Sequence, residues 1–242
     1  MLELKNISFA VTEDERQIDI IRNLSLTIGS EKFTVITGPN GSGKSTLARI
    51  IAGIERPTEG EILLNGENIT ELGITERAKL GISFAFQQPI RFKGITVFDL
   101  LQIAAGKSIT FAEGCNYLSE VGLCARDYIR REVNDSLSGG ELKRIEIATV
   151  LARHTRLSIF DEPEAGIDLW SFQNLIQIFE NMRRDIKDSS IIIISHQERI
   201  LSIADEIIVI ADGQVTKQGR GQDILPEILG TEAAIPTCEK LK

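Results

Sequence analysis

One short segment leaves few choices for how this chain folds. Residues 38–46 read GPNGSGKST; they follow the β-branched run 33–37, typical of a buried strand, and precede 47–53, typical of a helix closed by a glycine. A strand, a glycine-rich turn and a helix are the context in which the pattern G-x-x-x-x-G-K-[ST] binds phosphate. The glycines let backbone N–H groups point at phosphate oxygens, and the helix adds the positive end of its dipole. The sequence therefore predicts a phosphate loop.

The predicted phosphate loop assigns a role to two side chains. Lys44 would reach the β- and γ-phosphates of a nucleoside triphosphate, and the Ser45 hydroxyl would ligate Mg²⁺. A plain glycine-rich turn with a surface lysine is the alternative, which the complete pattern and its correct flanks disfavour. The residues expected to contact the nucleotide in this loop are Gly38, Pro39, Asn40, Gly41, Ser42, Gly43, Lys44, Ser45 and Thr46.

The bulk composition restricts the class of protein. The 242 residues allow one large domain, or a core with a small helical insertion. A formal net charge of -8 argues against a general nucleic-acid binder, which is usually basic. No apolar run is long enough to cross a bilayer, the start of the chain is unlike a signal peptide, and the three cysteines form no C-x-x-C pair. We expect a cytoplasmic protein that contacts a membrane only through a partner.

Strands that alternate with helices predict the fold class, an α/β protein with a mostly parallel sheet. The run 157–161 is an apolar strand, and the Ile-rich run 190–195 is apolar on both faces, as a central parallel strand is. Nearer the N-terminus, alternating apolar and polar residues predict a small antiparallel sheet beside this core. We expect one domain over residues 1–242, with the nucleotide-binding core and its antiparallel β subdomain in 1–95 and 135–242, and a helical insertion in 96–134.

Two adjacent carboxylates complete the predicted site. Asp161 and Glu162 follow the apolar strand, and a carboxylate at the carboxyl end of a parallel strand lies beside the phosphate loop. Asp161 would hold Mg²⁺, directly or through water, and Glu162 would take a proton from, or orient, the water that attacks the γ-phosphate. Two carboxylates alone usually belong to a solvated loop, but the preceding strand and the upstream phosphate loop favour the catalytic interpretation.

A second glycine-containing turn opens a helix at residues 137–141, which read LSGGE. Ser138 can cap that helix, which is its ordinary structural role, but the glycines and the helix dipole also repeat the anion-binding arrangement. One domain does not need two such arrangements for one triphosphate. With these motifs, nearly the whole chain resembles the ATP-binding-cassette (ABC) family, in which this signature contacts the ATP of the opposing subunit. The nucleotide contacts that the resemblance implies are Ser138, Gly139 and Gly140.

The resemblance implies an ABC ATPase fold of the P-loop NTPase class and a transient homodimer that forms on ATP. Two copies would face each other head to tail, with two ATP molecules and their Mg²⁺ ions between them. Each ATP would lie on Lys44 and Asp161 of one copy and on Ser138 and Gly140 of the other. The implied activity is Mg²⁺-dependent hydrolysis of ATP.

Three further residues match positions of the family pattern. Gln87 is at the Q-loop position, where it would contact Mg²⁺ and the lytic water, and His196 is at the switch position, within reach of the γ-phosphate. Asp168 matches the D-loop aspartate, although Ala165 replaces the usual serine. Their ordinary structural roles are a turn glutamine, a histidine after a strand and a helix cap. Val11 occupies the place of the aromatic on which most cassettes stack adenine, which puts selectivity for ATP over GTP in doubt.

Three stretches, 83–90, 138–144 and 195–201, are similar to SufC-type ATPases, the branch of the family that serves SUF iron–sulfur cluster assembly. That similarity implies docking of SufB- or SufD-like scaffold subunits near the Q-loop and the helical insertion. The partner surface would include Arg91, Phe92 and Lys93, although Phe92 could equally be an ordinary core residue.

Other classes of ABC ATPase share these motifs but differ in their partners, inserted segments or catalytic residues. The main alternative is the ATP-binding subunit of a membrane transporter, such as an importer, which would have the same site residues and a different partner. DNA-repair and chromosome ATPases carry a long coiled coil between the phosphate loop and the signature, for which this chain is too short. A regulatory cassette that does not hydrolyse ATP is disfavoured by Glu162 and His196.

Overall fold

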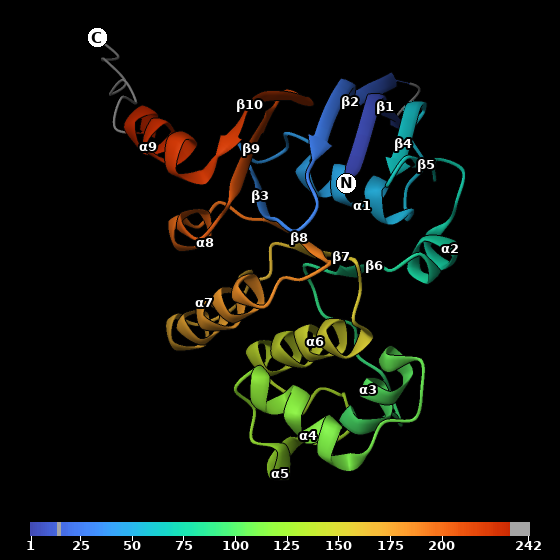
Figure 1. The fold of residues 1–242 in the computed structure, drawn as a ribbon, viewed down its shortest axis with the longest axis vertical. Helices are drawn as coiled ribbons and strands as arrows, with labels where there is room; N and C mark the ends of the chain where they lie inside the picture. The colour runs from blue at the N-terminus through green and yellow to red at the C-terminus, as the bar shows by residue number, and fades with distance from the viewer. Residues whose placement is uncertain (14–15, 233–242) are drawn as a thin grey trace.

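A six-stranded sheet forms the centre of the computed structural model, which describes residues 1–13 and 16–232 (Figure 1). Its strands are β3 (Phe33–Thr37), β6 (Ile82–Ala85), β7 (Leu157–Asp161), β8 (Ser190–Ile194), β9 (Glu206–Ala211) and β10 (Gln214–Arg220). They lie in the order β10-β9-β3-β8-β7-β6, and every neighbouring pair is parallel except β10 with β9. The predicted α/β class and mostly parallel core are confirmed.

A second, antiparallel sheet lies beside this core, at the upper right of Figure 1. Its strands are β1 (Leu2–Glu13), β2 (Arg16–Ile28), β4 (Glu59–Leu64) and β5 (Glu67–Asn68). They lie in the order β2-β1-β4-β5, and each neighbouring pair is antiparallel. The alternation of apolar and polar residues near the N-terminus therefore corresponds to strands with one buried face.

Both faces of the central sheet are covered, which explains the Ile-rich strand. In β8, Ile191 and Ile193 pack on one face of the sheet, whereas Ile192 and Ile194 pack on the other. The helix that follows the phosphate loop, α1 (Lys44–Ala52), packs on the second face together with the antiparallel sheet. Because neither face meets water, the strand is apolar at successive positions rather than at alternate ones.

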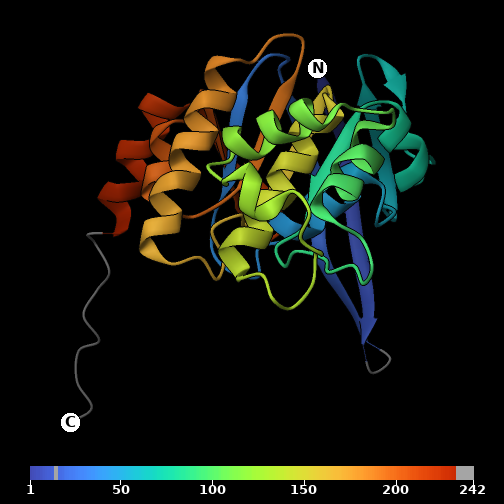
Figure 2. The same ribbon diagram turned by 90° about the horizontal axis from the view of Figure 1, so that it is seen from below.

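Helices far apart in the sequence cover the first face (Figure 2). They are α6 (Gly139–Arg153), α7 (Leu169–Arg184), α8 (Glu198–Ser202) and α9 (Gly221–Glu232). A further short helix, α2 (Ile74–Lys79), precedes β6. Within residues 1–13 and 16–232, none of the helices combines the length and the apolar character that crossing a bilayer requires.

The segment predicted to be helical, residues 96–134, contains three helices, of which the first two lie against α6 and the third against the second (Figure 1). They are α3 (Val97–Ala105), α4 (Phe111–Glu120) and α5 (Ala125–Tyr128). Thr96 and Thr110 begin α3 and α4 with capping boxes, in which the hydroxyl and a following carboxylate satisfy free N–H groups. The buried side chains of these helices belong to the same core as those of α6 and α7.

Candidate active site

The phosphate loop joins the carboxyl end of β3 to the N-terminus of α1, and two of its glycines leave no room for a side chain. Gly38 has a φ of +139°, and a Cβ there would lie 1.9 Å from the carbonyl oxygen of Ile210. Gly43 has a φ of +94°, and its Cβ would lie 2.6 Å from Cδ1 of Ile21. The backbone of the loop therefore lies directly against β9 and β2, which only glycine permits.

The N-terminus of α1 is free to bind an anion. Its N-cap residue, Gly43, provides no side-chain hydrogen bond, and the first turn carries no acidic residue. The N–H groups of a first helical turn have no partner within the helix, and the helix dipole adds positive potential at the same place. A phosphate group would satisfy both.

Lys44 extends back over the phosphate loop and is only 6% exposed. Its Nζ donates to the carbonyl oxygens of Gly38 at 2.9 Å and Pro39 at 2.7 Å. Burial lowers the pKa of Lys44, and the nearby carboxylates of Glu162 and Asp161 oppose that effect. The ammonium is thus bonded to neutral acceptors, and a phosphate oxygen would give it a charged one.

The two predicted Mg²⁺ ligands on β7 and α1 are in contact. Ser45, in the first turn of α1, donates from Oγ to Oδ1 of Asp161 at 2.8 Å. Asp161 ends β7 and is 1% exposed; burial raises the pKa of its carboxyl, and the bond from Ser45 opposes that rise. A hydroxyl and a carboxylate side by side are the hard oxygen ligands that Mg²⁺ takes, with water at its other positions. The donor set therefore fits the ion.

The predicted catalytic carboxylate is in contact with the predicted Q-loop glutamine. Nε2 of Gln87 donates to Oε2 of Glu162 at 2.6 Å, although the two residues are 75 positions apart. Glu162 has a φ of +43°, a conformation uncommon for residues other than glycine, and its N–H donates to the carbonyl oxygen of Ile194 at 3.0 Å. The carboxylate is thereby fixed at the carboxyl edge of the sheet, directly after Asp161.

The signature and D-loop residues act as helix caps within a single copy. Oγ of Ser138 accepts from the N–H of Glu141 at 3.3 Å, and the N–H of Ser138 donates to that carboxylate at 2.7 Å. Oδ1 of Asp168 accepts from the N–H groups of Trp170 and Ser171, both at 3.0 Å. In the part of the chain that the structure describes, no hydrogen bond or ion pair joins residues 138–140 to residues 38–46. One copy contains both motifs without bringing them together.

His196 lies on the loop that follows β8, and its ring is exposed. Its Nε2 is 3.5 Å from Nε2 of the adjacent Gln197. The residue before it, Ser195, is fully buried and donates from Oγ to a carboxylate oxygen of Glu164. That bond joins the loop that carries His196 to the loop that carries Glu162. Sequence reasoning did not find it, because a serine and a glutamate on separate loops carry no pattern.

A buried ion pair on α6 was also missed. Lys143 is 1% exposed; its Nζ donates to the carbonyl oxygen of Phe86 and lies 3.0 Å from Oε2 of Glu146. The N–H of Phe86 donates to the other oxygen of Glu146 at 2.9 Å. The helix that begins with the signature therefore contacts the backbone one residue before Gln87. The available signal was a lysine and a glutamate three positions apart, which on most helices are solvated.

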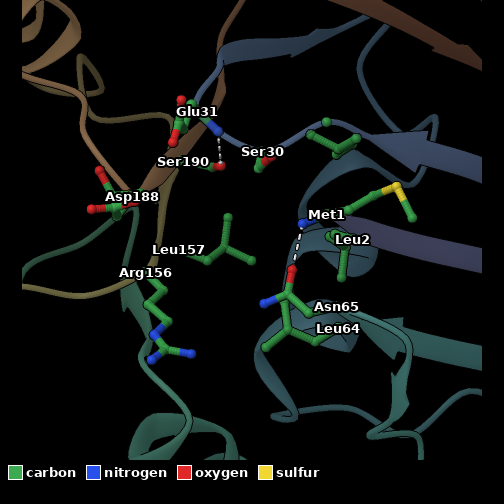
Figure 3. Close-up of a pocket in the computed structure, with 13 residues that line it drawn as sticks. Met1, Leu2, Ser30, Glu31, Leu64, Asn65, Arg156, Leu157, Asp188 and Ser190 are labelled. Carbon is green, nitrogen blue, oxygen red and sulfur yellow. Dashed lines mark hydrogen bonds between the residues drawn. The ribbon is translucent and has the colours of Figure 1, made fainter.

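A cavity of about 510 Å³ lies at the opposite edge of the molecule (Figure 3). It is lined by residues at the amino ends of β7 and β8, such as Leu157 and Ser190, and by the turn before β3. Figure 3 shows Oγ of Ser190 accepting from the N–H of Glu31, and the amino group of Met1 bonded to the side chain of Asn65. Ligands of open α/β sheets bind at the carboxyl edge, where the phosphate loop lies, so this cavity is not the nucleotide site.

Comparison with known proteins identifies the family. A family model described as ABC transporter matches residues 21–165, which is more than half of the chain. The chain belongs to this family. As an ABC ATP-binding subunit it binds ATP, and an ABC ATPase domain implies ATP hydrolysis.

Proteins named for different roles are similar to this chain. An uncharacterized ABC transporter ATP-binding protein of Methanocaldococcus jannaschii is 37% identical over 214 residues, covering 85% of each chain. The probable ATP-dependent transporter ycf16 of Cyanophora paradoxa is 33% identical over 243 residues, covering 94% of this chain and 91% of the relative. The spermidine/putrescine import ATP-binding protein PotA of Mesoplasma florum is 31% identical over 234 residues, covering 94% and 63%.

Solved structures confirm the predicted ABC ATPase fold. The dimeric cassette MJ0796, bound to ADP and Pi in a post-hydrolysis state, has a TM-score of 0.81 at 25% identity, covering 91% of this chain and 98% of that chain. A nucleotide-free ATP-binding cassette from an ABC transporter has a TM-score of 0.80 at 24% identity, covering 98% and 99%. At 24% identity, the similarity to the nucleotide-free cassette shows a shared fold and nothing more.

Proposed function

We propose that this chain is a Mg²⁺-dependent ATPase subunit whose two copies close on ATP, and that its closure moves a scaffold of iron–sulfur cluster assembly, as in SufC-type ATPases. The observation that carries the ATPase assignment is the pair of contacts Ser45–Asp161 and Gln87–Glu162. They gather two oxygen ligands for Mg²⁺, a carboxylate for the lytic water and the glutamine that positions both, at the end of α1 that is free to bind phosphate.

In this proposal each side chain exchanges a contact within the chain for a contact with the substrate. Lys44 leaves the carbonyl oxygens of its own loop for the β- and γ-phosphates of ATP. Ser45 and Asp161 would hold Mg²⁺, which would supply positive charge to the phosphate oxygens. Glu162, released by Gln87, accepts a proton from the attacking water or orients it. His196, on the exposed loop after β8, would contact the γ-phosphate of bound ATP.

The second half of the site comes from another copy. Residues 138–140 open α6 with two glycines, and among the described residues no hydrogen bond or ion pair joins them to the phosphate loop, so we take the signature to be available to the ATP of a second copy. Asp168 would face the same interface. The dimeric state of the related cassette that holds ADP and Pi supports this arrangement. We also propose that residues 1–242 form one domain, with 96–134 inserted between two parts of the core.

The substitution Glu162→Gln tests the ATPase proposal. Glutamine keeps the size of the side chain and one hydrogen-bonding oxygen, but it lacks the carboxylate that would accept a proton. We therefore expect ATP binding and ATP-driven dimerisation to persist while ATP turnover falls by about 10²-fold or more. Steady-state phosphate release and sedimentation velocity measure the two properties. Glu61→Gln, at an exposed position of β4, is the matched control and should hydrolyse normally. If Glu162→Gln hydrolyses ATP like the parent, Glu162 is not the catalytic carboxylate.

The SufC-like assignment is supported by the signature helix. Transporter subunits more often carry glutamine directly after Ser-Gly-Gly, whereas this chain carries Glu141 and, two positions later, the buried Lys143. The proposed docking surface lies just after the Q-loop. There Ile90 is 51% exposed and Arg91 pairs with Asp135 at 3.1 Å, whereas Phe92 packs partly into the core. Ile90 and Arg91 are therefore the better candidates for scaffold contacts than Phe92.

A transporter subunit is the second candidate, because the import protein PotA and the ATP-dependent transporter ycf16 are among the relatives. The two candidates differ only in the partner. Purification of the tagged chain from its native cell should bring down a soluble scaffold subunit, and a SufB- or SufD-like subunit should form a complex with it in gel filtration. Ile90→Asp should abolish that complex without changing ATP hydrolysis by the isolated chain. Recovery of a polytopic membrane protein instead would decide for transport.

A further inference from the structure

The first turn of α7 exposes two large apolar side chains. Leu169 is 68% exposed and Trp170 is 78% exposed. Asp168 caps this turn, because its Oδ1 accepts from the N–H of Trp170 at 3.0 Å. An indole that a capped helical turn holds in water is typical of protein–protein contacts, where tryptophan is enriched among the residues that carry most of the binding energy.

This exposed pair adjoins the signature. Ser171, directly after Trp170, packs on Gly140: a Cβ on that glycine would lie 3.2 Å from the Ser171 hydroxyl oxygen. A Cβ on Gly139 would lie 3.8 Å from the carbonyl oxygen of Gly166, on the loop that leads into α7. Residues 138–140 and 166–171 therefore form one continuous surface, which we call the signature face.

We propose that Leu169 and Trp170 are the apolar anchors by which a second copy of this chain binds the signature face when ATP is present. The inference rests on the proposed composite site, in which the phosphate loop of the second copy closes against residues 138–140. Closure of that site would also cover the residues that adjoin them. An aromatic side chain that is buried in this way removes some 150–250 Å² from water, a gain that separated copies do not have.

The position of the pair selects a second copy over other occupants. A scaffold subunit or a membrane seated on Leu169 and Trp170 would cover the signature face and block residues 138–140 from the ATP of the second copy. The proposed scaffold surface around Ile90 belongs to a different segment, after β6. A second copy on the signature face and a scaffold subunit at Ile90 can therefore bind at the same time.

The chain contains a single tryptophan, so its emission reports on this surface alone. The experiment uses the full chain with Glu162→Gln, titrated with ATP and Mg²⁺, and follows the emission maximum together with sedimentation velocity. We expect the emission to shift to shorter wavelength over the same ATP and protein concentrations at which the dimer forms. A shift at concentrations where the chain stays monomeric would mean that its own residues cover Trp170, which contradicts the proposal.

Substitutions measure the contribution of the anchor. Added to Glu162→Gln, Trp170→Ala should weaken the ATP-dependent dimer at least tenfold, a typical loss for a residue at the centre of an interface, while Trp170→Phe should retain most of the affinity. Ile103→Ala removes an equally exposed apolar side chain, 66% exposed on α3, and should leave the dimer unchanged. Circular dichroism melts confirm that each variant is folded.

The outcomes separate this inference from the proposed function. If Glu162→Gln dimerises on ATP, but the emission stays constant and Trp170→Ala binds as tightly as the parent, the anchor role is wrong and the composite site stands. If Glu162→Gln never dimerises at any ATP concentration, the composite site is wrong, and the anchor role falls with it.

Discussion

Replacing Lys143 by methionine should destabilise the fold by about 3–5 kcal/mol, because it removes one partner of a buried ion pair. Lys143 is 1% exposed and its partner Glu146 is 15% exposed, with 3.0 Å between Nζ and Oε2. The methionine side chain is one heavy atom shorter and apolar, and it leaves the Glu146 carboxylate without a cation and the Phe86 carbonyl without its donor. In a chain of this size each kcal/mol lowers the melting temperature by about 2–4 °C, so the expected drop is about 10 °C.

The loss of stability in Lys143→Met should depend on pH, and the environment of Glu146 sets the direction. Burial raises the pKa of Glu146, and Lys143 opposes that rise. Without Lys143 the folded-state pKa moves further above its ordinary value of about 4.3. Between the unfolded and folded pKa values the folded state binds a proton that the unfolded state does not, so stability falls as pH rises through this window. Lys143→Met should therefore be closer to the parent in stability at about pH 5 than at about pH 8.

Urea unfolding at both pH values, followed by circular dichroism, measures the loss. Adding Glu146→Leu to Lys143→Met should restore part of the stability, because the orphaned carboxylate is removed, although the Phe86 N–H then loses its acceptor. Lys5→Met is the matched control: its partner Glu3 is 3.8 Å away, the lysine side chain is 53% exposed, and the cost should stay below about 1 kcal/mol. A loss below about 1 kcal/mol for Lys143→Met, or no recovery in the double variant, would refute the reasoning.

Three further substitutions test other parts of the structure. Lys44→Ala should weaken ATP binding about ten- to a hundredfold, as expected for a charged hydrogen bond of about 1.5–3 kcal/mol, and calorimetric titration measures it; unchanged affinity would remove the phosphate-loop assignment. Gly38→Ala should abolish ATP binding and lower the melting temperature, since its Cβ would lie 1.9 Å from a backbone oxygen, whereas Gly41→Ala, with no heavy atom within 4 Å, should cost only about 1 kcal/mol of backbone strain. Arg77→Met should lower the free energy of unfolding in urea by about 3 kcal/mol, because the fully buried guanidinium donates to carbonyl oxygens at the end of α1 and in the loop before α2. An unchanged urea midpoint would contradict this.

The parts of the site that the sequence predicted are those that depend on neighbours in the chain. The phosphate loop needs a strand before it and a helix after it, and β3 and α1 occupy those places. Asp161 ends an apolar run, so its position at the edge of the sheet followed from the strand alone. The Ile-rich run 190–194 was identifiable as a central strand because both faces of a covered parallel sheet exclude water.

The parts that the sequence did not predict are contacts between segments far apart in the chain. Whether Lys143 is solvated or buried depends on which element covers that side of α6, and β6 with the Q-loop does so. The bond from Ser195 to Glu164 likewise needs two loops at the ends of neighbouring strands β7 and β8. The sequence left Phe92 as either a partner contact or a core residue. The structure places its ring partly in the core, because its backbone N–H donates to the carbonyl oxygen of Val133, near the C-terminal end of the helical segment.

The contacts within one copy suggest why the site can open and close with little net change in free energy. Lys44 already bonds to two carbonyl oxygens, Ser45 to Asp161 and Gln87 to Glu162, so these three side chains have partners before ATP binds. For these three side chains each contact with substrate would replace an existing hydrogen bond, and the gain per contact is the difference between a charged and a neutral partner, about 1 kcal/mol. Loss of the γ-phosphate then returns each side chain to its partner within the chain. A site built in this way would bind ATP reversibly, and closure of the second copy would supply the rest of the driving force.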